Sequence, residues 1–464
     1  IGVLMPLILP GNVATATAST TFDVANSCRF DDGDSPSMSK TPGASSNRRT
    51  FTFSAWVKRS TLGSGVNVIF SASNSANRDF IYFEGDALKV HKYNSGYEYK
   101  ITTNRLFRDV SAWYHIVAAF DTTQGTASNR IKLYVNGVQE TSLADSDYPS
   151  EDFDTNYNTV SLPQTIGKDH DASNYFDGYI AEVVMIDGSA LAPTSFGEFN
   201  SDSPTIWQPI DVSGLTFGTN GYYLDFEASA NLGNDANGGT DFSESNIAAI
   251  NQCVDTCTNN FATMNPLVKG NTALTFSQGN LKLTSGGGWG HAVGSIGVAH
   301  GKWYWEVDEI NSNNNAFFGI CNEFNLGHLD GDSTPYSENG LMLYFYDGRR
   351  TIDGTDSEGE YNAWGTTHGF ALDLDSDPRT IKFYKDNSLE ATENLTANFP
   401  AGEFVFPIFM GSASSNPAIV EFNFGNPATA LASAANDANG YGSFEFAPPS
   451  GYIAICTKNL GSDG

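Results

Sequence analysis

The stretch GKWYWEVDEI, residues 301–310, decides the fold because its side chains alternate. Trp303, Trp305 and Val307 fall on one face of an extended chain, and the residues between them fall on the other. This period of two predicts a β-strand. We expect Trp303 and Trp305 to pack in a sheet core rather than to form a sugar-stacking platform.

Similar segments continue through the block of residues 271–464. Each is four to eight residues long, alternates or is continuously apolar, and is bounded by Gly, Asn or Asp, which is typical of short strands. They are LTFSQGNLKLT, FFGIC, LMLYFYDGRRTIDG, FALDLDSDPRTIKFYKDN, FVFPIFMGSAS and AIVEFNFG. The order GKWYWEV, Gly319-Ile320, ALDLDSDPRTIKFYKDN and VEFNFG resembles the SPRY sandwich.

The block of residues 21–199 has the same character. FTFSAWVKRS (51–60) alternates with a period of two, and Asn136-Gly137 lies between two alternating runs, which is a strong hairpin signal. The order CRFDDGD, FTFSAWVKR, WYHIVAAFDTT, IKLYVNGV and YFDGYIAEVVMID resembles the concanavalin-like laminin-G sandwich. The fold class expected is therefore all-β, with two antiparallel β-sandwiches.

Two further segments complete the expected domain organisation. Residues 200–270 are rich in Asn, Gly, Asp and Ser, and we interpret them as an extended connector with some strand pairing. Residues 1–20 form an N-terminal arm whose apolar start, Ile1–Pro10, is too short to span a bilayer and is interrupted by prolines. The arm could dock on a neighbouring subunit or pack on its own domain.

Charge and cysteine content limit the possible partners. With 53 acidic and 24 basic residues the formal charge is −29, which disfavours nucleic acid and anionic membranes and suits a saline environment. The five cysteines cannot all pair within one chain. Cys253 and Cys257 form a lone C-x3-C, so structural or free thiols are expected, with a local disulfide as the alternative.

The motifs of common enzyme classes are missing from this sequence. We find no G-x-S-x-G, no phosphate-binding loop, no H-E-x-x-H and no dinucleotide-binding glycine pattern. Glu306 and Asp308 have the i, i+2 spacing of a glycosidase carboxylate pair, but solvated edge charges explain them as well. The expectation is a protein that is not an enzyme, with a secreted glycan hydrolase as a rival.

One acidic loop has the composition of a calcium site. GKDHDASNYFDG (167–178) offers Asp169, Asp171, Asn174 and Asp177, and hard oxygen ligands on a flexible loop suit Ca²⁺. The alternative is a turn in which these side chains cap backbone amides. FDDGD (30–34) is a second acidic loop.

A third acidic run is not a calcium loop. DLDSD (373–377) begins like an EF-hand, but Pro378 and Tyr384 occupy the positions that require Gly and Glu. We interpret it as a hairpin turn.

Two loops carry candidate ligand-binding side chains. Trp289 and His291 lie in the glycine-rich SGGGWGHAVG, and Tyr346, Arg349 and Arg350 lie in YDGRRTIDG. Glycine lets a backbone approach a ligand, and an exposed Trp can stack on a sugar ring. Packing against a neighbouring subunit is the alternative.

The whole arrangement resembles structural proteins of marine bacteriophages, especially tail fibres and related appendages. The resemblance rests on the laminin-G-like block, IDGSALAPTSFGEF (186–199), GLTFGTNGYYLDF and the SPRY-like block. It implies a virion-surface adhesin that recognises a host-surface glycan or protein without catalysis, and that forms homo-oligomers, often trimers, with other virion proteins as partners. The alternatives are a self-assembling capsid or filament subunit and a secreted or cell-surface lectin-like adhesin.

Overall fold

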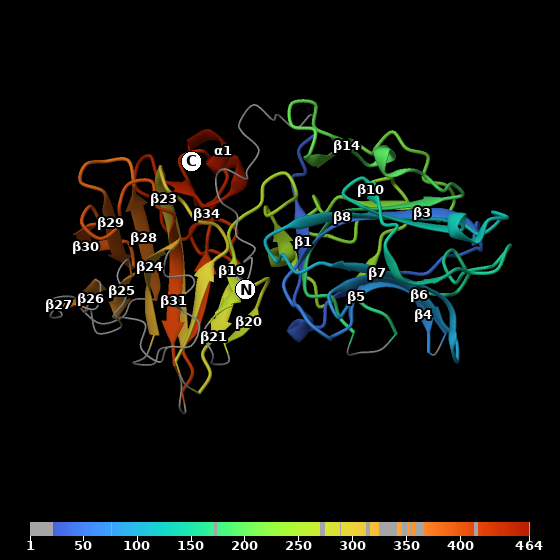
Figure 1. The fold of residues 1–464 in the computed structure, drawn as a ribbon, viewed down its shortest axis with the longest axis horizontal. Coiled ribbons are helices and arrows are strands. Elements are labelled where there is room, and N and C mark those ends of the chain that lie inside the picture. Colours follow the sequence, from blue (N-terminus) through green and yellow to red (C-terminus); the bar gives the residue numbers. More distant parts are fainter. Residues whose placement is uncertain are drawn as a thin grey trace. The chain divides into compact units, whose positions relative to one another are not determined.

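The computed structural model describes residues 22–75, 77–170, 174–269, 274–287, 289–311, 316–323, 341–345, 350–352, 355–357, 366–412 and 416–463. The chain forms two compact units, residues 18–258 and residues 259–464. Each unit has its own pair of large sheets and its own main hydrophobic core (Figure 1). The all-β class and the two antiparallel sandwiches are confirmed. No helix within the described residues is long and apolar enough to cross a membrane.

The first sheet of unit 18–258 is built around a long central pair. Strands β3 (Thr50–Arg59) and β13 (Gly178–Asp187) pair along their lengths, with Phe53 opposite Met185. The sheet order is β10-β9-β8-β3-β13-β1-β18, with β16 also on β13. The remaining bounds are β1 (Ser27–Phe30), β8 (Trp113–Asp121), β9 (Ile131–Val135), β10 (Val138–Gln139), β16 (Tyr222–Leu224) and β18 (Gln252–Cys253).

The second sheet of this unit lies in the layer opposite β3 and β8 (Figure 1). Its order is β11-β7-β6-β5-β4-β12-β2-β17. The strands are β2 (Ser37–Lys40), β4 (Asn67–Asn74), β5 (Asn77–Glu84), β6 (Ala87–Tyr93), β7 (Tyr97–Leu106), β11 (Leu143–Asp147), β12 (Gln164–Ile166) and β17 (Ser243–Ser245).

The side chains of β3 alternate between two faces as predicted, and both faces are buried. Phe51, Phe53, Ala55 and Val57 face the core between the sheets. Trp56 faces the other way, into a smaller cluster with Trp207 from β15. Trp207 belongs to the segment of residues 193–217, which covers this face and contains the two-stranded sheet of β14 (Gly197–Phe199) and β15 (Trp207–Pro209).

The Asn136-Gly137 hairpin is confirmed between β9 and β10, where Val135 pairs with Val138. Both turn residues have positive φ, 47° for Asn136 and 77° for Gly137, as a tight two-residue turn requires. A Cβ on Gly137 would also lie 2.3 Å from the Trp207 ring. Only glycine satisfies both conditions.

The segment interpreted as a connector contributes strands to the first unit. Within residues 200–258, β16 pairs with β13, β17 with β2 and β18 with β1. The boundary between the two units falls after Thr258. The packed residues of this segment include Tyr222, Leu224, Phe226, Leu232 and Phe242 in the main core.

Unit 259–464 has two large sheets. One has the order β19-β22-β31-β24-β25-β26-β27. Its strands are β19 (Met264–Lys269), β22 (Gly290–Gly294), β24 (Ala316–Asn322), β25 (Leu341–Phe345), β26 (Arg350–Ile352), β27 (Thr355–Ser357) and β31 (Val405–Gly411).

The other sheet has the order β20-β21-β32-β23-β28-β29-β30, with β35 (Ile453–Ala454) parallel to β23. Its strands are β20 (Thr275–Ser277), β21 (Lys282–Thr284), β23 (Lys302–Asn311), β28 (Thr367–Asp373), β29 (Thr380–Lys385), β30 (Ser388–Asn394) and β32 (Ile419–Asn423). β33 (Ala435–Asn436) pairs with β34 (Ser443–Phe444), and the helix α1 spans Thr457–Asp463.

The opening stretch, residues 301–310, lies in β23 as predicted. Trp303 and Trp305 are 0% and 1% exposed, in the core between the two sheets. The opposite face of β23 is buried as well, because Tyr304 packs under Phe444 and Tyr452. The hairpin at 373–377 is also confirmed, since β28 and β29 pair with Asp373 opposite Thr380.

Candidate functional site

A pocket of about 300 Å³ opens in unit 259–464 beside the distal half of β23. Asp308 and Glu309 come from β23, and Thr367 begins the neighbouring strand β28, where it pairs with Asp308. The segments after β32 and β34 complete the wall. The lining residues are Asp308, Glu309, Thr366, Thr367, Thr429, Ala430, Leu431, Glu445 and Phe446.

Two consecutive residues of one strand normally point to opposite faces of a sheet. Asp308 and Glu309 nevertheless both line the pocket, next to a register shift between Glu309 and Asn311 against β32. Such a β-bulge turns side chains out of strict alternation. It explains how β23 supplies two adjacent carboxylates to one site.

The pocket is rich in hydrogen-bond acceptors. Asp308 Oδ1 accepts a bond of 2.6 Å from the Thr367 hydroxyl, and the Thr366 hydroxyl donates to Asp386. The hydroxyl protons of Thr366 and Thr367 are therefore already donated, so these hydroxyl oxygens can only accept further hydrogen bonds from a ligand. Glu309 Oε1 is buried without a hydrogen-bond partner. None of the described lining residues is a lysine or an arginine.

Burial dominates the electrostatics of these carboxyl groups. It raises the pKa of Glu309 to about 8. It also raises the pKa of Asp308, with a further rise from the charge of Glu445 and a lowering by the Thr367 bond. A ligand that donates hydrogen bonds would satisfy these groups.

Glu306 is buried and fully engaged, which corrects the interpretation as a solvated edge charge. It is 1% exposed and accepts hydrogen bonds from the Tyr304 hydroxyl (3.0 Å) and from the backbone amides of Glu445 (2.8 Å) and Phe446 (2.9 Å). Burial raises its pKa to about 7, against the lowering by these bonds. Glu306 therefore fixes the segment that carries Glu445 and Phe446 into the pocket wall.

The predicted ligand loops are placed differently from expectation. His291, expected on an exposed loop, is 2% exposed in β22 and lies opposite Met410. Trp289 is half-buried and stacks on Phe317, with ring centroids 5.1 Å apart. Arg350 forms an ion pair of 2.9 Å with Glu393. Tyr346 and Arg349 lie outside the described residues.

The structure describes three of the four predicted calcium ligands, namely Asp169, Asn174 and Asp177. Asp169 is buried and its carboxylate accepts hydrogen bonds from Arg78 (2.9 Å) and Asn174 (3.2 Å), so its charge already has a counter-ion. Asp177 instead groups with the second acidic loop, beside Asp31 and Asp32. Asp171 lies outside the described residues.

A serine–histidine contact lies among the described residues of unit 18–258. Ser54 Oγ lies 2.8 Å from His115 Nε2, and Trp207 Nε1 donates to His115 Nδ1 at 2.9 Å. With Nδ1 accepting, Nε2 must carry the proton and donate to Ser54, so this imidazole cannot take the serine proton. Both residues are buried, and burial lowers the pKa of His115 to about 3. This contact is structural.

All five cysteines are free thiols, which is the first of the two alternatives that the sequence left open. Cys257 is half-buried and the others are buried. Burial raises the pKa of Cys28, Cys257, Cys321 and Cys456. These thiols are therefore poor nucleophiles.

Comparison with known proteins supports the assignment of the first block. Residues 32–194 match the family model of the Concanavalin A-like lectin/glucanases superfamily, in the Laminin_G_3 group. The match falls within the block expected to form the laminin-G-like sandwich. No curated protein sequence matches the chain.

Several solved structures are similar to part of the chain. The SPRY domain of human HERC1 has 20% identity over 34% of this chain and 96% of its own, with a TM-score of 0.28. The PSpry domain of TRIM65 has 16% identity over 35% and 89%, with a TM-score of 0.28. A heptameric SAP-like pentraxin from Limulus polyphemus has 15% identity over 37% and 80%, with a TM-score of 0.27.

Proposed function

We propose that this chain is a non-catalytic binding protein that takes a carbohydrate into the pocket lined by Asp308, Glu309 and Phe446. The observation that carries the proposal is the composition of the wall, where carboxylate and hydroxyl acceptors stand beside a half-buried aromatic ring. Sugar hydroxyls donate hydrogen bonds, and the apolar face of a sugar ring packs on an aromatic side chain. The volume of about 300 Å³ is at the lower end for small-ligand sites.

The match of residues 32–194 to a lectin and glucanase superfamily supports carbohydrate as a ligand class for unit 18–258, whereas the pocket in unit 259–464 is supported by its own lining residues. The saturated hydrogen bonding of Glu306 supports binding rather than hydrolysis, because this carboxylate has no free role as acid or base. The hydrolase hypothesis required Glu306 and Asp308 together, and only Asp308 lines the pocket.

A glycan array probed with the full chain, followed by titration of the best ligand, tests this proposal. We expect Glu309→Ala and Phe446→Ala each to weaken binding about tenfold or more, since each removes a contact worth about 1.4 kcal/mol or more. Glu390→Ala, which removes a half-buried carboxylate on β30 outside the pocket, is the matched control. Wild-type affinity in both pocket variants would contradict the site, and release of reducing sugar would contradict non-catalytic binding.

We further propose that the chain is an adhesin on a virion appendage, exposed outside the host cell and assembled as a homo-oligomer. The resemblance of the chain to marine bacteriophage appendage proteins supports this role. Peptide mass spectrometry of density-purified particles should find peptides of both units at a fixed ratio to the major capsid protein. A high ratio would favour the capsid or filament alternative. Peptides confined to the cell-surface or secreted fraction would favour a cellular lectin.

A further inference from the structure

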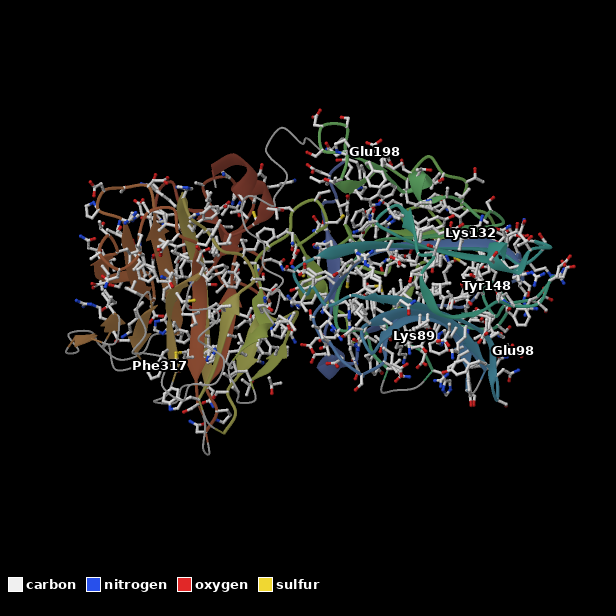
Figure 2. All side chains as sticks on the ribbon, in the orientation of Figure 1. Lys89, Glu98, Lys132, Tyr148, Glu198 and Phe317 are labelled. Atoms are coloured by element: carbon white, nitrogen blue, oxygen red, sulfur yellow. The ribbon has the colours of Figure 1, made fainter. Side chains whose placement is uncertain are left out.

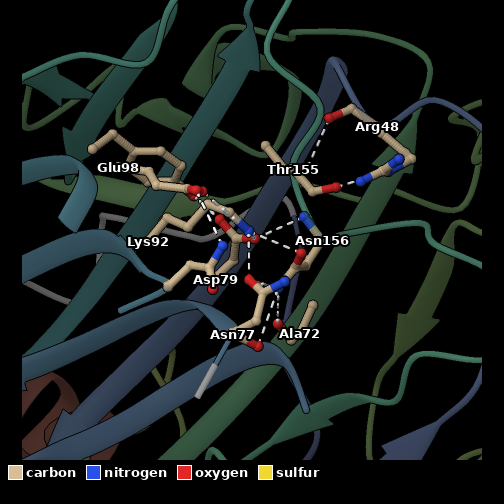
Figure 3. A network of polar contacts seen from close by, with 10 residues as sticks. Arg48, Ala72, Asn77, Asp79, Lys92, Glu98, Thr155 and Asn156 are labelled. Carbon is tan, nitrogen blue, oxygen red and sulfur yellow. Dashed lines mark hydrogen bonds and ion pairs between the residues drawn. The ribbon is translucent and has the colours of Figure 1, made fainter. Parts of the chain in front are cut away.

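A lysine, an aspartate and an asparagine meet inside unit 18–258. Four residues on the adjacent strands β4 to β7 pair in one row across the second sheet, in the order Ala72, Asp79, Lys92 and Tyr99. Ala72 and Tyr99 belong to the main core between the sheets, so this row faces inward. Asn156, from the segment between β11 and β12, contacts the row and completes the group (Figure 3).

The amine of Lys92 is held against the side-chain amide of Asn156. Nζ donates to Asn156 Oδ1 at 2.8 Å, and a C=O bond is about 1.23 Å long, so Nζ lies within about 4 Å of the amide carbon Cγ. Reacting atoms in a near-attack geometry are about 3–3.5 Å apart, which a small rotation of either side chain provides. The two residues are 3% and 5% exposed, so the amide is protected from water.

Asp79 is placed to move the protons that a reaction between these two groups requires. Its Oδ2 lies 2.8 Å from Lys92 Nζ and accepts a hydrogen bond of 2.7 Å from the backbone amide of Asn156. The Tyr99 hydroxyl donates to the other oxygen, Oδ1, and thereby orients the carboxyl group. Burial raises the pKa of Asp79, so this carboxyl group can hold a proton taken from the lysine.

We propose that Lys92 and Asn156 join in an intramolecular isopeptide bond, with Asp79 transferring the protons. The Lys92 ammonium first gives one proton to Asp79, and the lone pair of the neutral amine then attacks Asn156 Cγ to form the new C–N bond. The Cγ–Nδ2 bond breaks, and Nδ2 leaves as ammonium with its own two hydrogens, a second lysine proton and the proton held by Asp79. The new amide keeps the third lysine hydrogen and Asp79 returns to the carboxylate, so the step balances without an oxidant or a further reactant.

Asn77 is a second amide within reach, because Lys92 Nζ also donates to its Oδ1 at 3.0 Å. Asn77 is half-buried, whereas Asn156 is buried and its backbone amide contacts Asp79. Asn77 Oδ1 also accepts from Asn156 Nδ2 at 3.0 Å and so holds the leaving nitrogen. The bond is therefore assigned to Asn156, and Asn77 orients it.

The bond would fasten β6 to the segment between β11 and β12. Lys92 and Asn156 are 64 positions apart, so the cross-link closes a long loop and restricts the unfolded chain, as a disulfide does. The ion pair of Lys92 with Asp79 is the state before the bond forms. This site is independent of the proposed carbohydrate pocket, which belongs to the other unit.

Mass spectrometry of the full, denatured chain tests the proposal. Because the bond releases ammonia, the wild-type mass should lie about 17 Da below that of the sequence, and digestion should yield a branched peptide that joins Lys92 to Asn156. Lys92→Met and Asn156→Ala should keep the full mass, and Asp79→Ala should lower the cross-linked fraction about tenfold or more. Asn77→Ala is the matched control, since it removes the neighbouring amide and should retain the branched peptide.

The wild-type chain decides the outcome even if a variant at this buried site does not fold. Lys92→Met removes the ion pair and the bond together, so the mass and not the stability separates the two. The proposal is overturned if the wild-type mass equals that of the sequence, or if about 17 Da is lost without a branched peptide, as a succinimide at an asparagine–glycine pair would give. A branched peptide that joins Lys92 to Asn77 or Asp79 instead would overturn the assignment to Asn156.

Discussion

Replacing Lys92 with methionine should destabilise unit 18–258 strongly, because Lys92 neutralises a buried carboxylate. Lys92 Nζ lies 2.8 Å from Asp79 Oδ2, and the two side chains are 4% and 0% exposed. Nζ also donates to Asn77 Oδ1 at 3.0 Å and to Asn156 Oδ1 at 2.8 Å (Figure 3). The Asn156 amide and the Tyr99 hydroxyl donate to Asp79 as well.

The size of the effect follows from this geometry. Two unit charges 2.8 Å apart attract by about 6 kcal/mol at an effective dielectric constant of about 20. The desolvation of both groups opposes this attraction, and burial already raises the pKa of Asp79 despite Lys92. Removing one partner of a buried pair typically costs about 3–5 kcal/mol, because the other charge is left uncompensated.

Thermal unfolding at neutral pH measures this cost. For a unit of this size we expect Lys92→Met to lower the melting temperature by roughly 6–20 °C. Lys132→Met, on the partly exposed β9 of the same unit, is the matched control and should shift it by no more than about 2 °C (Figure 2). The double variant Lys92→Met/Asp79→Asn should recover part of the loss. Equal shifts for Lys92→Met and Lys132→Met would refute the reasoning.

Three further predictions concern other buried groups. Burial raises the pKa of Glu182 to about 8 from 4.5, so stability falls as pH rises between these values. Glu182→Gln should flatten the dependence of the free energy of unfolding on pH from 5 to 8, by at most about 4 kcal/mol over that range, and an unchanged slope would count against it. Glu306→Gln should cost about 1–3 kcal/mol in denaturant unfolding, since an amide nitrogen cannot accept from the amides of Glu445 and Phe446. In denaturant without reductant, a thiol reagent should titrate all five cysteines, and a smaller number would reveal a disulfide.

Local patterns in the sequence were sufficient to predict the long strands. Alternation along 51–57 and 303–307 correctly predicted which side chains face the core between the sheets, but it did not predict that the opposite face of each strand is buried as well. The Asn136-Gly137 turn was equally local, since its φ values depend on those two residues alone. These features need no knowledge of the rest of the chain.

The site features were harder to predict because they depend on register between distant segments. Glu306 is covered by residues 445–446, and no spacing within β23 indicates that cover. His291 was assigned to a loop because of its glycines, yet pairing of β22 with β31 makes it a buried strand residue. Asp31 and Asp177 lie in two loops that the sequence flagged separately, and the antiparallel register of β1 and β13 unites them.

The segment 200–258 illustrates the same limit in the fold. Its strands β16, β17 and β18 are two or three residues long. Such strands are too short to show a periodic pattern of apolar residues in the sequence. Their pairing partners lie at the start and end of the first block. Composition rich in turn residues therefore does not distinguish a connector from a set of short edge strands.

The pairing of β1 with β18 has a mechanical consequence. Ser27 lies opposite Cys253, and the Val24 amide donates to the Thr258 hydroxyl at 3.1 Å, so both ends of unit 18–258 leave it side by side. A pulling force applied through these ends would load the antiparallel ladder perpendicular to its strands, opening its hydrogen bonds one after another rather than all at once. Under tension the unit would thus yield first by peeling β18 from β1, at low force, while the long β3–β13 pair behind it remains intact.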